Sequence, residues 1–229
     1  DSDHVSDATT KLLKFHGTYQ QDNRDTRKER RREGLGKEYS FMVRNRIPGG
    51  KITAEQFLSE LDIADEFGNG SLRITTRQGI QLHGVVKGNL WNTIHRINEI
   101  KLSTQSACGD VERNVVCCPA PLRHDGIRDQ LQQFADDIAD HLRPRGRAYH
   151  EIWLQDSVTG EKQRLVGPPE ESEDDPIYGA AYLPRKFKTG IALCDDNCTG
   201  VYDQDVGLLA VTDGDKLRGF NVLVGGGMG

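Results

Sequence analysis

The residues best able to do chemistry in this chain are hydrogen-bond donors, and one group of them alternates along residues 72–84. The polar positions of this stretch are separated largely by leucine and isoleucine. Successive side chains of a strand point to opposite faces, so the alternation predicts one apolar face and one face rich in donors. That polar face is either a solvated sheet surface or a binding site for an anion. Its members are Arg73, Thr75, Arg77, Gln81 and His83.

Basic residues also occur in four separate stretches that a strand or a tight turn would hold in place. A guanidinium group binds carboxylates and oxyanions through two parallel hydrogen bonds, and a lysine acts as a point charge or a proton donor. Each stretch alone is ordinary, but together they would form an anion pocket if the fold brings them to one place. The residues are Arg46, Arg73, Arg77, Arg113, Arg185, Lys186 and Lys188.

The chain ends in an apolar strand pattern followed by glycines, VLVGGGMG, at residues 222–229. Such a run resembles the start of a dinucleotide-binding motif, but the third glycine would be residue 230 and no strand–helix–strand unit begins here. Backbone amides of a glycine loop can also hold carboxylates. We favour this second role for Gly225, Gly226 and Gly227.

Five cysteines, two of them adjacent, do not suit the even framework of a secreted disulfide-rich protein. A cytoplasmic location is therefore expected. Cys194 and Cys198 have a C-x3-C spacing that occurs in metal and iron–sulfur sites. Because two thiolates without further ligands do not make such a site, we expect no metal ligand in this chain.

The first half of the chain predicts an antiparallel sheet with helices on one face, which is an α+β arrangement. A strand over 39–47 ends at a Pro-Gly-Gly turn, and a helix follows whose capping box is Thr53 and Gln56. The strand-like residues 72–84 and a second helix from Leu90 complete the order.

The second half has the pattern of a mixed domain. Its strongest helix is predicted over 127–142, and strands are predicted over 148–154 and 183–193. Residues 155–180, rich in Glu, Asp, Pro and Gly, are predicted to be a loop. A hairpin is expected around Asp213 and Gly214 near the end.

These elements predict three parts: a charged N-terminal arm over 1–38, a first domain over 39–108 and a second over 109–229. The basic run of the arm could be a nucleic-acid patch, but interspersed acidic residues favour a solvated arm or helix. The net charge of −5 and the hydrophobic content of 35% give no reason to expect nucleic acid or a membrane as partner. Both ends look cut, so we expect this chain to be the N-terminal part of a longer protein.

Five motifs in the same order resemble the sulfite and nitrite reductase haemoprotein family. They are RNRIPGG, LRITTRQGIQLHG, CGDVERNVVCCPAP, YLPRKFKTGIAL and GFNVLVGGGMG, and the resemblance runs from about residue 13 to the end. The upstream segments LLKFHGTYQQDNRD and YSFMVRNR are most similar to ferredoxin-dependent, plant-type sulfite reductases.

The resemblance implies a ferredoxin-like half-domain followed by a mixed α/β sirohaem-binding domain that is incomplete here. It implies two cofactors, sirohaem and a 4Fe-4S cluster, with the cluster ligands downstream of Gly229. The expected sirohaem contacts are Arg73, Thr75, Arg77, Gln81, His83, Asn114, Arg185, Gly225, Gly226 and Gly227. The expected catalytic residues, which bind the sulfur oxyanion and supply protons, are Arg46, Arg113, Lys186 and Lys188.

The activity implied is the six-electron reduction of sulfite to sulfide. Lys188 stands where nitrite reductases of the family have asparagine, so sulfite is favoured over nitrite as substrate. Reduced ferredoxin is favoured over a flavoprotein reductase as electron donor, which would make the enzyme ferredoxin-type and not an NADPH haemoprotein subunit. Assimilatory nitrite reduction and a non-catalytic tetrapyrrole- or anion-binding module are the alternatives. The chain by itself is expected to be inactive.

Overall fold

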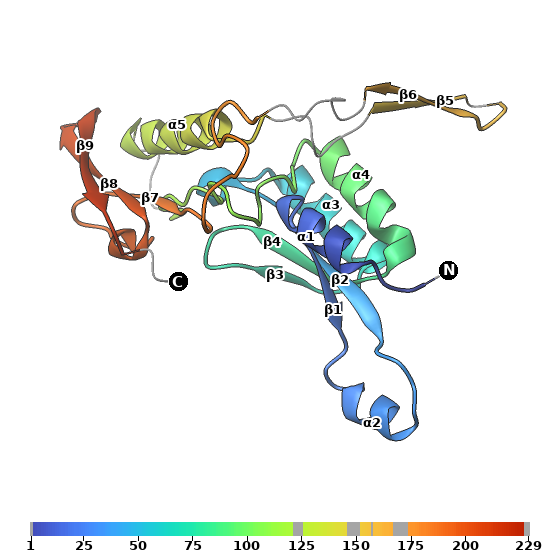
Figure 1. The fold of residues 1–229 in the computed structure, drawn as a ribbon. Helices are drawn as coiled ribbons and strands as arrows, with labels where there is room; N and C mark the ends of the chain where they lie inside the picture. The colour runs from blue at the N-terminus through green and yellow to red at the C-terminus, as the bar shows by residue number, and fades with distance from the viewer. Residues whose placement is uncertain (1, 121–125, 146–151, 157, 167–173, 227–229) are drawn as a thin grey trace.

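The computed structural model describes residues 2–120, 126–145, 152–156, 158–166 and 174–226, and it contains both helices and sheets. Figure 1 labels the elements in chain order. They are α1 (Asp7–Phe15), β1 (Thr18–Asp22), α2 (Arg27–Arg32), β2 (Tyr39–Arg44), α3 (Ala54–Phe67), β3 (Leu72–Ile74), β4 (Ile80–Val85), α4 (Leu90–Glu99), α5 (Gly126–His141), β5 (Ile152–Gln155), β6 (Lys162–Val166), β7 (Thr189–Ala192), β8 (Val206–Asp213) and β9 (Lys216–Val224), with 3₁₀ turns at η1 (Pro48–Gly50), η2 (Lys87–Asn89) and η4 (Val201–Asp203).

The first half folds as a four-stranded antiparallel sheet in the order β1–β2–β4–β3, with α3 and α4 on one face (Figure 1). Phe41, Val43 and Leu82 of the strands meet Ile63 of α3 and Ile97 of α4 in a fully buried core. Burial of one such side chain stabilises the fold by about 1.5–3 kcal/mol. Because strand side chains alternate, the residues between them point to the opposite face, where a ligand can reach them.

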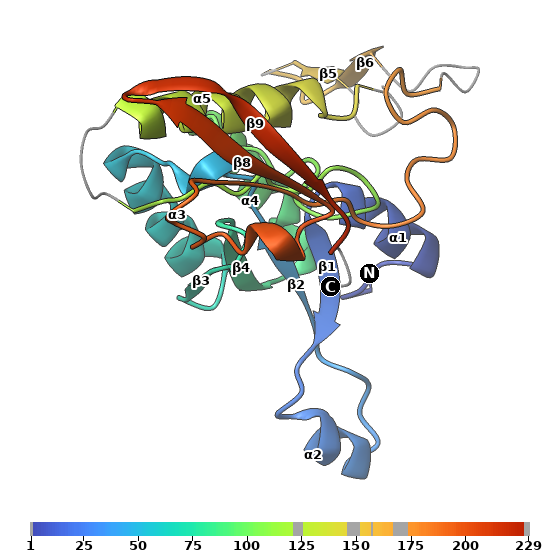
Figure 2. The ribbon, with the colours of Figure 1, turned by 90° about the vertical axis from the view of Figure 1, so that its left-hand side faces the viewer.

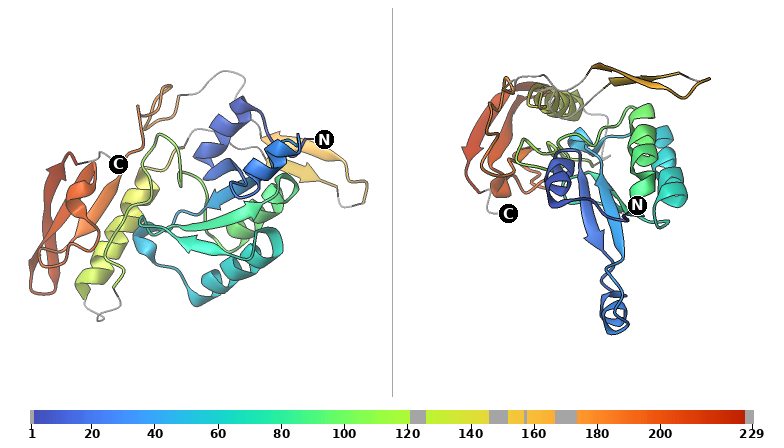
Figure 3. Two further views of the ribbon diagram at one scale, coloured as in Figure 1. Left: turned by 90° about the horizontal axis from the view of Figure 1, so that it is seen from below. Right: turned by 45° about the vertical axis from the view of Figure 1, so that its right-hand side comes forward.

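The second half packs α5 against the three-stranded sheet β7–β8–β9, as Figures 2 and 3 show. Ile127, Leu131, Ala135 and Ala139 recur at helical spacing on α5 and are buried against strand residues such as Ile191. The helix predicted over 127–142 from this periodicity is confirmed to within one residue at each end.

The helix with the capping box of Thr53 and Gln56, the helix from Leu90 and the hairpin at Asp213 and Gly214 are also observed. In the capping box, the Gln56 backbone N–H donates to the Thr53 hydroxyl at 3.1 Å and the Thr53 N–H donates to the Gln56 side chain at 2.9 Å. These predictions held because each depends on side chains only a few residues apart.

Only part of the charged arm expected over residues 1–38 stands apart as a solvated segment. α1 and β1 belong to the first layer, and β1 pairs antiparallel with β2 from Thr18↔Val43 to Asp22↔Tyr39. Pairing with β2 satisfies backbone hydrogen-bonding groups of β1. Because few side chains of β1 are buried, its sequence does not need the apolar pattern by which a strand is predicted. The basic helix α2 is exposed and stands away from the sheet in Figures 1 and 2, as a solvated helix would.

Two strand predictions are also corrected. Residues 72–84 form a hairpin of β3 and β4 instead of one strand, because the chain turns at Thr75–Gly79 and Gln78 adopts a left-handed φ of 60°. The loop predicted over 155–180 contains β6, which pairs with β5 through backbone hydrogen bonds that its polar sequence did not reveal. The strand predicted over 148–154 is observed from Ile152, and residues 148–151 lie outside the described residues.

In the part of the chain that the structure describes, no helix has the length and apolar character needed to cross a membrane.

Candidate functional site

A cationic cavity of about 310 Å³ lies where the β3–β4 hairpin meets the segment that leads into β7. Five positively charged side chains line it, and none of the described residues that line it carries a carboxylate. A cavity walled by one sign of charge concentrates ions of the opposite sign, so this one suits an anionic ligand. The charged residues are Arg44, Arg77, Arg113, Lys186 and Lys188, and the uncharged polar ones are Asn45, Thr75, Thr76, Gln81 and Asn114.

Parallel pairing of two distant segments brings Arg113 and Asn114 to the lysines. The Arg113 N–H donates to the Phe187 carbonyl at 2.8 Å, and the Val116 N–H donates to the Thr189 carbonyl at 3.1 Å. The Phe187 N–H donates in turn to the Val111 carbonyl at 3.0 Å. Of the strand predicted over 183–193, only β7 is a regular strand. The bonds with residues 111–116 continue the backbone pairing before β7, toward the cavity.

The β3–β4 turn is fastened to the second half by Arg77 and Gln78. Arg77 donates to the Gln204 side chain at 2.7 Å and also to the Asn114 carbonyl. The Cys117 N–H donates to the Gln78 side-chain oxygen at 3.0 Å, and the Gln78 amide donates back to the Cys117 carbonyl. The turn is therefore held in place before any ligand binds.

The polar face of the sheet continues the cavity. The register pairs Gln81 with Arg73 on one side and with Arg44 on the other, so these three side chains share one face. With its amide oxygen toward Arg44, Gln81 accepts from Nε at 2.9 Å and donates to His83 Nε2 at 3.3 Å. Burial, and then the charges of Arg73 and Arg44, lower the pKa of His83, which suits the neutral acceptor form.

A second cavity, of about 610 Å³, adjoins the first and shares Arg113 and Lys186 with it. It places Arg185, an expected cofactor contact, beside the shared cations. Lys11 and Lys14 of α1 and Tyr19 of β1 also line it, together with the single carboxylate of Asp110. The N-terminal elements therefore contribute to the site.

Backbone groups hold the cations of the cavity in place. Arg113 is buried and donates from Nε and NH2 to the Ala107 carbonyl at 3.2 and 2.9 Å. Lys188 is 8% exposed, and its Nζ lies 3.4 Å from the Asp203 carbonyl.

Burial lowers the pKa of Lys186, and the charges of Lys188, Arg113, Arg185 and Arg77 lower it further. A lysine with a lowered pKa releases a proton more readily, as a proton donor must.

The structure brings most, but not all, of the predicted site residues together. Arg113, Lys186, Lys188, Arg77, Thr75, Gln81 and Asn114 line the first cavity, and Arg185 lines the second. Arg73 and His83 lie on the same sheet face as Gln81 and are not among the residues that line either cavity.

Asn114 has a structural role as well as a place in the cavity wall. Its amide nitrogen donates to the carbonyls of Ile47 and Arg77 at 2.6 and 2.7 Å. Its side-chain oxygen and the Arg77 Nε are buried and have no hydrogen-bond partner among the described residues. Both atoms therefore remain available for a polar ligand or water.

Arg46, predicted to be catalytic, lies elsewhere. Its backbone pairs with Ser103, and its guanidinium donates to the Ala139 carbonyl of α5 at 2.7 Å. It lines neither cationic cavity and joins the sheet to α5 instead. The arginine that lines the cavity from β2 is Arg44, which sequence reasoning missed as a site residue although it lies in the same predicted strand, 39–47, as Arg46.

The glycine run is not seen at the cavity. Gly225 and Gly226 have φ angles of 121° and 73°, and a Cβ on Gly226 would lie 2.0 Å from the Tyr202 carbonyl oxygen. Gly226 therefore allows the strand end to pass close to η4, and neither Gly225 nor Gly226 lines a cationic cavity. Gly227 lies outside the described residues.

Two buried glutamates contact residues in or next to the wall of the first cavity. Glu60 of α3 accepts a hydrogen bond from Asn45, and Glu112 accepts one from the Thr189 hydroxyl at 3.0 Å. Burial raises the pKa of each carboxyl to about 7, although these hydrogen bonds act in the opposite direction. Both groups therefore exchange protons near neutral pH.

Replacing Glu60 with glutamine is expected to change how stability depends on pH. The folded state holds the Glu60 proton more tightly than the unfolded chain, so this carboxyl stabilises the fold fully below its ordinary pKa of 4.5 and loses that contribution as pH rises through about 7. E60Q should therefore gain stability relative to the wild type across that range, as measured by urea unfolding at several pH values. The exposed Asp62→Asn of the same helix is the control; a wild type and E60Q with parallel pH profiles would contradict the argument.

Two family descriptions match the chain. Residues 34–100 match the nitrite/sulfite reductase ferredoxin-like half domain, and residues 108–229 match the nitrite and sulphite reductase 4Fe-4S domain. The expected fold class, a ferredoxin-like half-domain followed by a mixed domain, is confirmed by these matches and by the helices and sheets described above. The expected domain limits at residues 38 and 108 remain predictions.

Curated relatives share about half of their aligned residues with this chain. The sulfite reductase (NADPH) hemoprotein beta-component of Staphylococcus saprophyticus is 51% identical over 225 residues, which are 98% of this chain and 38% of that protein. The protein of the same name from Myxococcus xanthus is 51% identical over 220 residues, 96% of this chain and 37% of that protein. The chain thus spans little more than a third of the length of these relatives.

Solved structures show the same fold at low sequence identity. The Mycobacterium tuberculosis NirA protein superposes with a TM-score of 0.62 at 23% identity, over 98% of this chain and 36% of that one. A dissimilatory sulfite reductase I chain superposes with a TM-score of 0.50 at 16% identity, over 76% of this chain and 34% of that one.

One expectation is overturned by the relatives. Those with about 50% identity are named as NADPH-dependent haemoprotein components, whereas the sequence motifs favoured a ferredoxin-dependent enzyme. The ferredoxin-type assignment is therefore wrong. It rested on two short segments, residues 12–25 and 39–46, which contain the end of α1 with the edge strand β1 and the inner strand β2.

Proposed function

The chain belongs to the nitrite and sulfite reductase family, and on this premise we propose that it is the sirohaem- and anion-binding portion of a sulfite reductase haemoprotein. The observation that carries the proposal is the cavity lined by five cations and no carboxylate of the described residues. In the full protein, the activity would be the six-electron reduction of sulfite to sulfide.

The donor set of the site fits sirohaem, an iron tetrapyrrole rich in carboxylates. The planar guanidinium of arginine binds a carboxylate through two parallel hydrogen bonds, which fix the orientation of the carboxylate. The polar sheet face offers Arg44, Arg73 and Gln81 side by side, and the adjoining cavity offers Arg185. The unpartnered Arg77 Nε and Asn114 oxygen are further groups to which a polar ligand could bind.

When bound, sirohaem with its coupled 4Fe-4S cluster supplies the electrons and the iron that carry out the reduction. The residues of this chain would bind the sulfite anion and deliver protons to its oxygens. Arg113 is fixed by the Ala107 carbonyl and would hold the anion by charge. Lys186 and Lys188 would donate the protons with which each oxygen leaves as water. Burial and the surrounding cations lower the pKa of Lys186, which favours release of its proton.

Sulfite is proposed over nitrite for two reasons. The family resemblance implies that nitrite reductases typically have asparagine at the position of Lys188, and Lys188 lines the cationic cavity. The curated relatives of about 50% identity are also named as sulfite reductases. Because those relatives are named as NADPH-dependent, we propose an NADPH-linked flavoprotein as the electron donor. The cluster ligands would lie in the portion of the relatives that this chain does not span.

The decisive experiment compares sulfite and nitrite as substrates of the full-length protein that contains this chain. We expect the protein to carry sirohaem and iron–sulfur absorbance and to show a higher kcat/KM for sulfite with an NADPH-linked flavoprotein. A strong preference for nitrite would defeat the substrate assignment. Failure to take up any tetrapyrrole would instead support a non-catalytic anion-binding module.

A further inference from the structure

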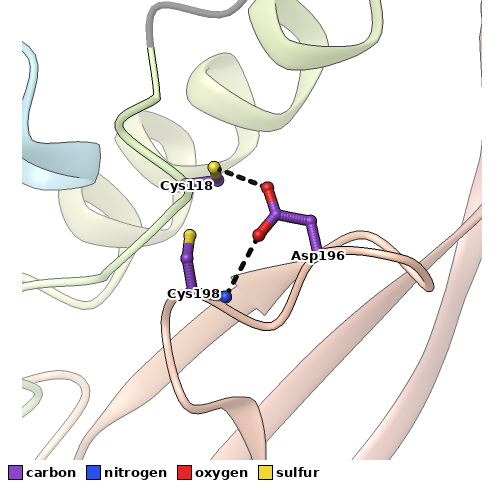
Figure 4. A group of neighbouring side chains, drawn as sticks. All are labelled: Cys118, Asp196 and Cys198. Atoms are coloured by element: carbon purple, nitrogen blue, oxygen red, sulfur yellow. Dashed lines mark hydrogen bonds between the residues drawn. The ribbon is translucent and has the colours of Figure 1, made fainter.

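Two cysteines and an aspartate meet in the second half of the chain, and no part of the proposed reaction uses them (Figure 4). Cys118 follows the connector that leads out of the first half, whereas Asp196 and Cys198 belong to the loop after β7. Their three ligand atoms all lie within 4.8 Å of one another. The Cys118 thiol donates to Asp196 Oδ2 at 2.9 Å, and the Cys198 N–H donates to Asp196 Oδ1 at 3.2 Å.

From this arrangement we infer that Cys118, Asp196 and Cys198 form a binding site for a divalent zinc ion. Tetrahedral zinc bonded to sulfur at about 2.3 Å and to oxygen at about 2.0 Å separates its ligand atoms by roughly 3.3–3.8 Å. The three ligand atoms lie within 4.8 Å of one another, and Cys118 Sγ lies 2.9 Å from Asp196 Oδ2, so side-chain rotations would bring them to that spacing. Water would occupy the fourth position, as it does in zinc sites with three protein ligands.

The choice of metal follows from the ligands. Thiolates are soft ligands that favour zinc over magnesium or calcium, which prefer oxygen. A 4Fe-4S cluster needs four ligands of the cysteine type, and only two cysteines belong to this group. Two thiolates and one carboxylate carry three negative charges, and a divalent ion together with the neighbouring Arg128, 3.6 Å from Asp196, balances them.

Both sides of the site are held in place by the fold. The loop is anchored where Val201 N–H donates to the Asn197 side chain at 2.7 Å and the Thr199 hydroxyl donates to the Ile191 carbonyl at 3.2 Å. On the other side, Cys117 is bonded to Gln78 of the β3–β4 turn, so its neighbour Cys118 is positioned as well. Ligands fixed in this way lose little freedom on binding a metal.

Cys198 therefore has Cys118 as its neighbouring thiol in this site, and not Cys194, the other cysteine of the C-x3-C pair. Cys194 is exposed and does not belong to the group, although it shares a loop with Cys198. The ligand that completes the site, Cys118, lies far away in the sequence. Zinc would tie the loop after β7 to the connector that also holds the cationic cavity's hairpin.

The test is a zinc titration of the reduced, metal-free chain under anaerobic conditions, with cobalt absorption as a second readout. We expect one ion per chain and thiolate-to-cobalt charge-transfer absorption. Cys118→Ser and Cys198→Ser should each abolish both signals, and Asp196→Asn should weaken affinity about tenfold or more. Cys194→Ser, the matched control from the same loop, should bind as the wild type does.

Three results would overturn the inference: no stoichiometric zinc binding by the wild type, an unchanged affinity in C118S, or an equal loss in C194S and C198S. Circular dichroism of each variant without metal shows whether it is folded. If C118S fails to fold, C198S decides the question, because Cys198 is exposed and its replacement disturbs little packing.

Discussion

Replacing Lys186 with glutamine is expected to lower the turnover of sulfite by the full-length enzyme about 10²- to 10⁴-fold, the usual contribution of a positioned proton donor. Lys186 lines both cationic cavities, and burial together with the surrounding cations lowers its pKa. Glutamine keeps much of the side-chain size and a hydrogen-bond donor but cannot release a proton. The measurement is steady-state kcat for sulfite alongside haem absorbance, which should remain near the wild-type value.

The pH profile gives a second readout for the same residue. Activity that needs protonated Lys186 should decline as pH rises through its lowered pKa, earlier than for an ordinary lysine. Lys188→Gln removes one neighbouring positive charge, so it should move this decline to higher pH. Lys216→Gln, which replaces an exposed lysine at the start of β9, is the matched control and should leave turnover unchanged. Loss of haem in step with activity would show that Lys186 binds the cofactor and does not supply protons.

Replacing Arg77 with alanine is expected to destabilise the chain by about 2–3 kcal/mol and to reduce its capacity to hold sirohaem in the full protein. Arg77 donates to the Gln204 side chain and to the Asn114 carbonyl, and it joins the β3–β4 turn to the second half. Alanine leaves these buried acceptors without a partner and removes a positive charge near Glu112. Urea unfolding measures the first effect, and haem content of the full-length protein measures the second.

Arg73→Ala is the matched control for the stability change, because Arg73 comes from the same hairpin and is exposed. Its effect on the free energy of unfolding should stay within about 0.5 kcal/mol, as is usual for surface substitutions. Comparable destabilisation by the two variants would show that the bonds made by Arg77 do not hold the hairpin. A stable R77A protein with normal haem content would contradict both roles.

Local patterns in the sequence were sufficient for much of the site. In β4 the alternation separated the buried Ile80 and Leu82 from Gln81 and His83, because neighbouring residues of an extended chain must point to opposite faces. The capping box of Thr53 and Gln56 and the periodic α5 were predictable for the same reason: each depends on contacts within a few residues. The resemblance of five motifs was sufficient for the family.

Only the tertiary structure decided which cations share a cavity. Arg44 and Arg46 are two positions apart and look equivalent in the sequence, yet β2 ends at Arg44 and Arg46 pairs with Ser103 instead. The guanidinium of Arg46 then reaches α5, and that of Arg44 enters the cavity. A strand's end and the packing that follows it depend on distant segments, so the alternation could not distinguish the two.

The same physical limit applies to the edge strand β1 and to the cysteine site. By itself, the sequence determined the main helices, the donor-rich face and the family, because these are set by side-chain chemistry over short distances. The pairing of β1 with β2 and the meeting of Cys118 with Cys198 were decided by the tertiary structure. Contacts of this kind depend on loop closure and packing between segments that no local pattern records.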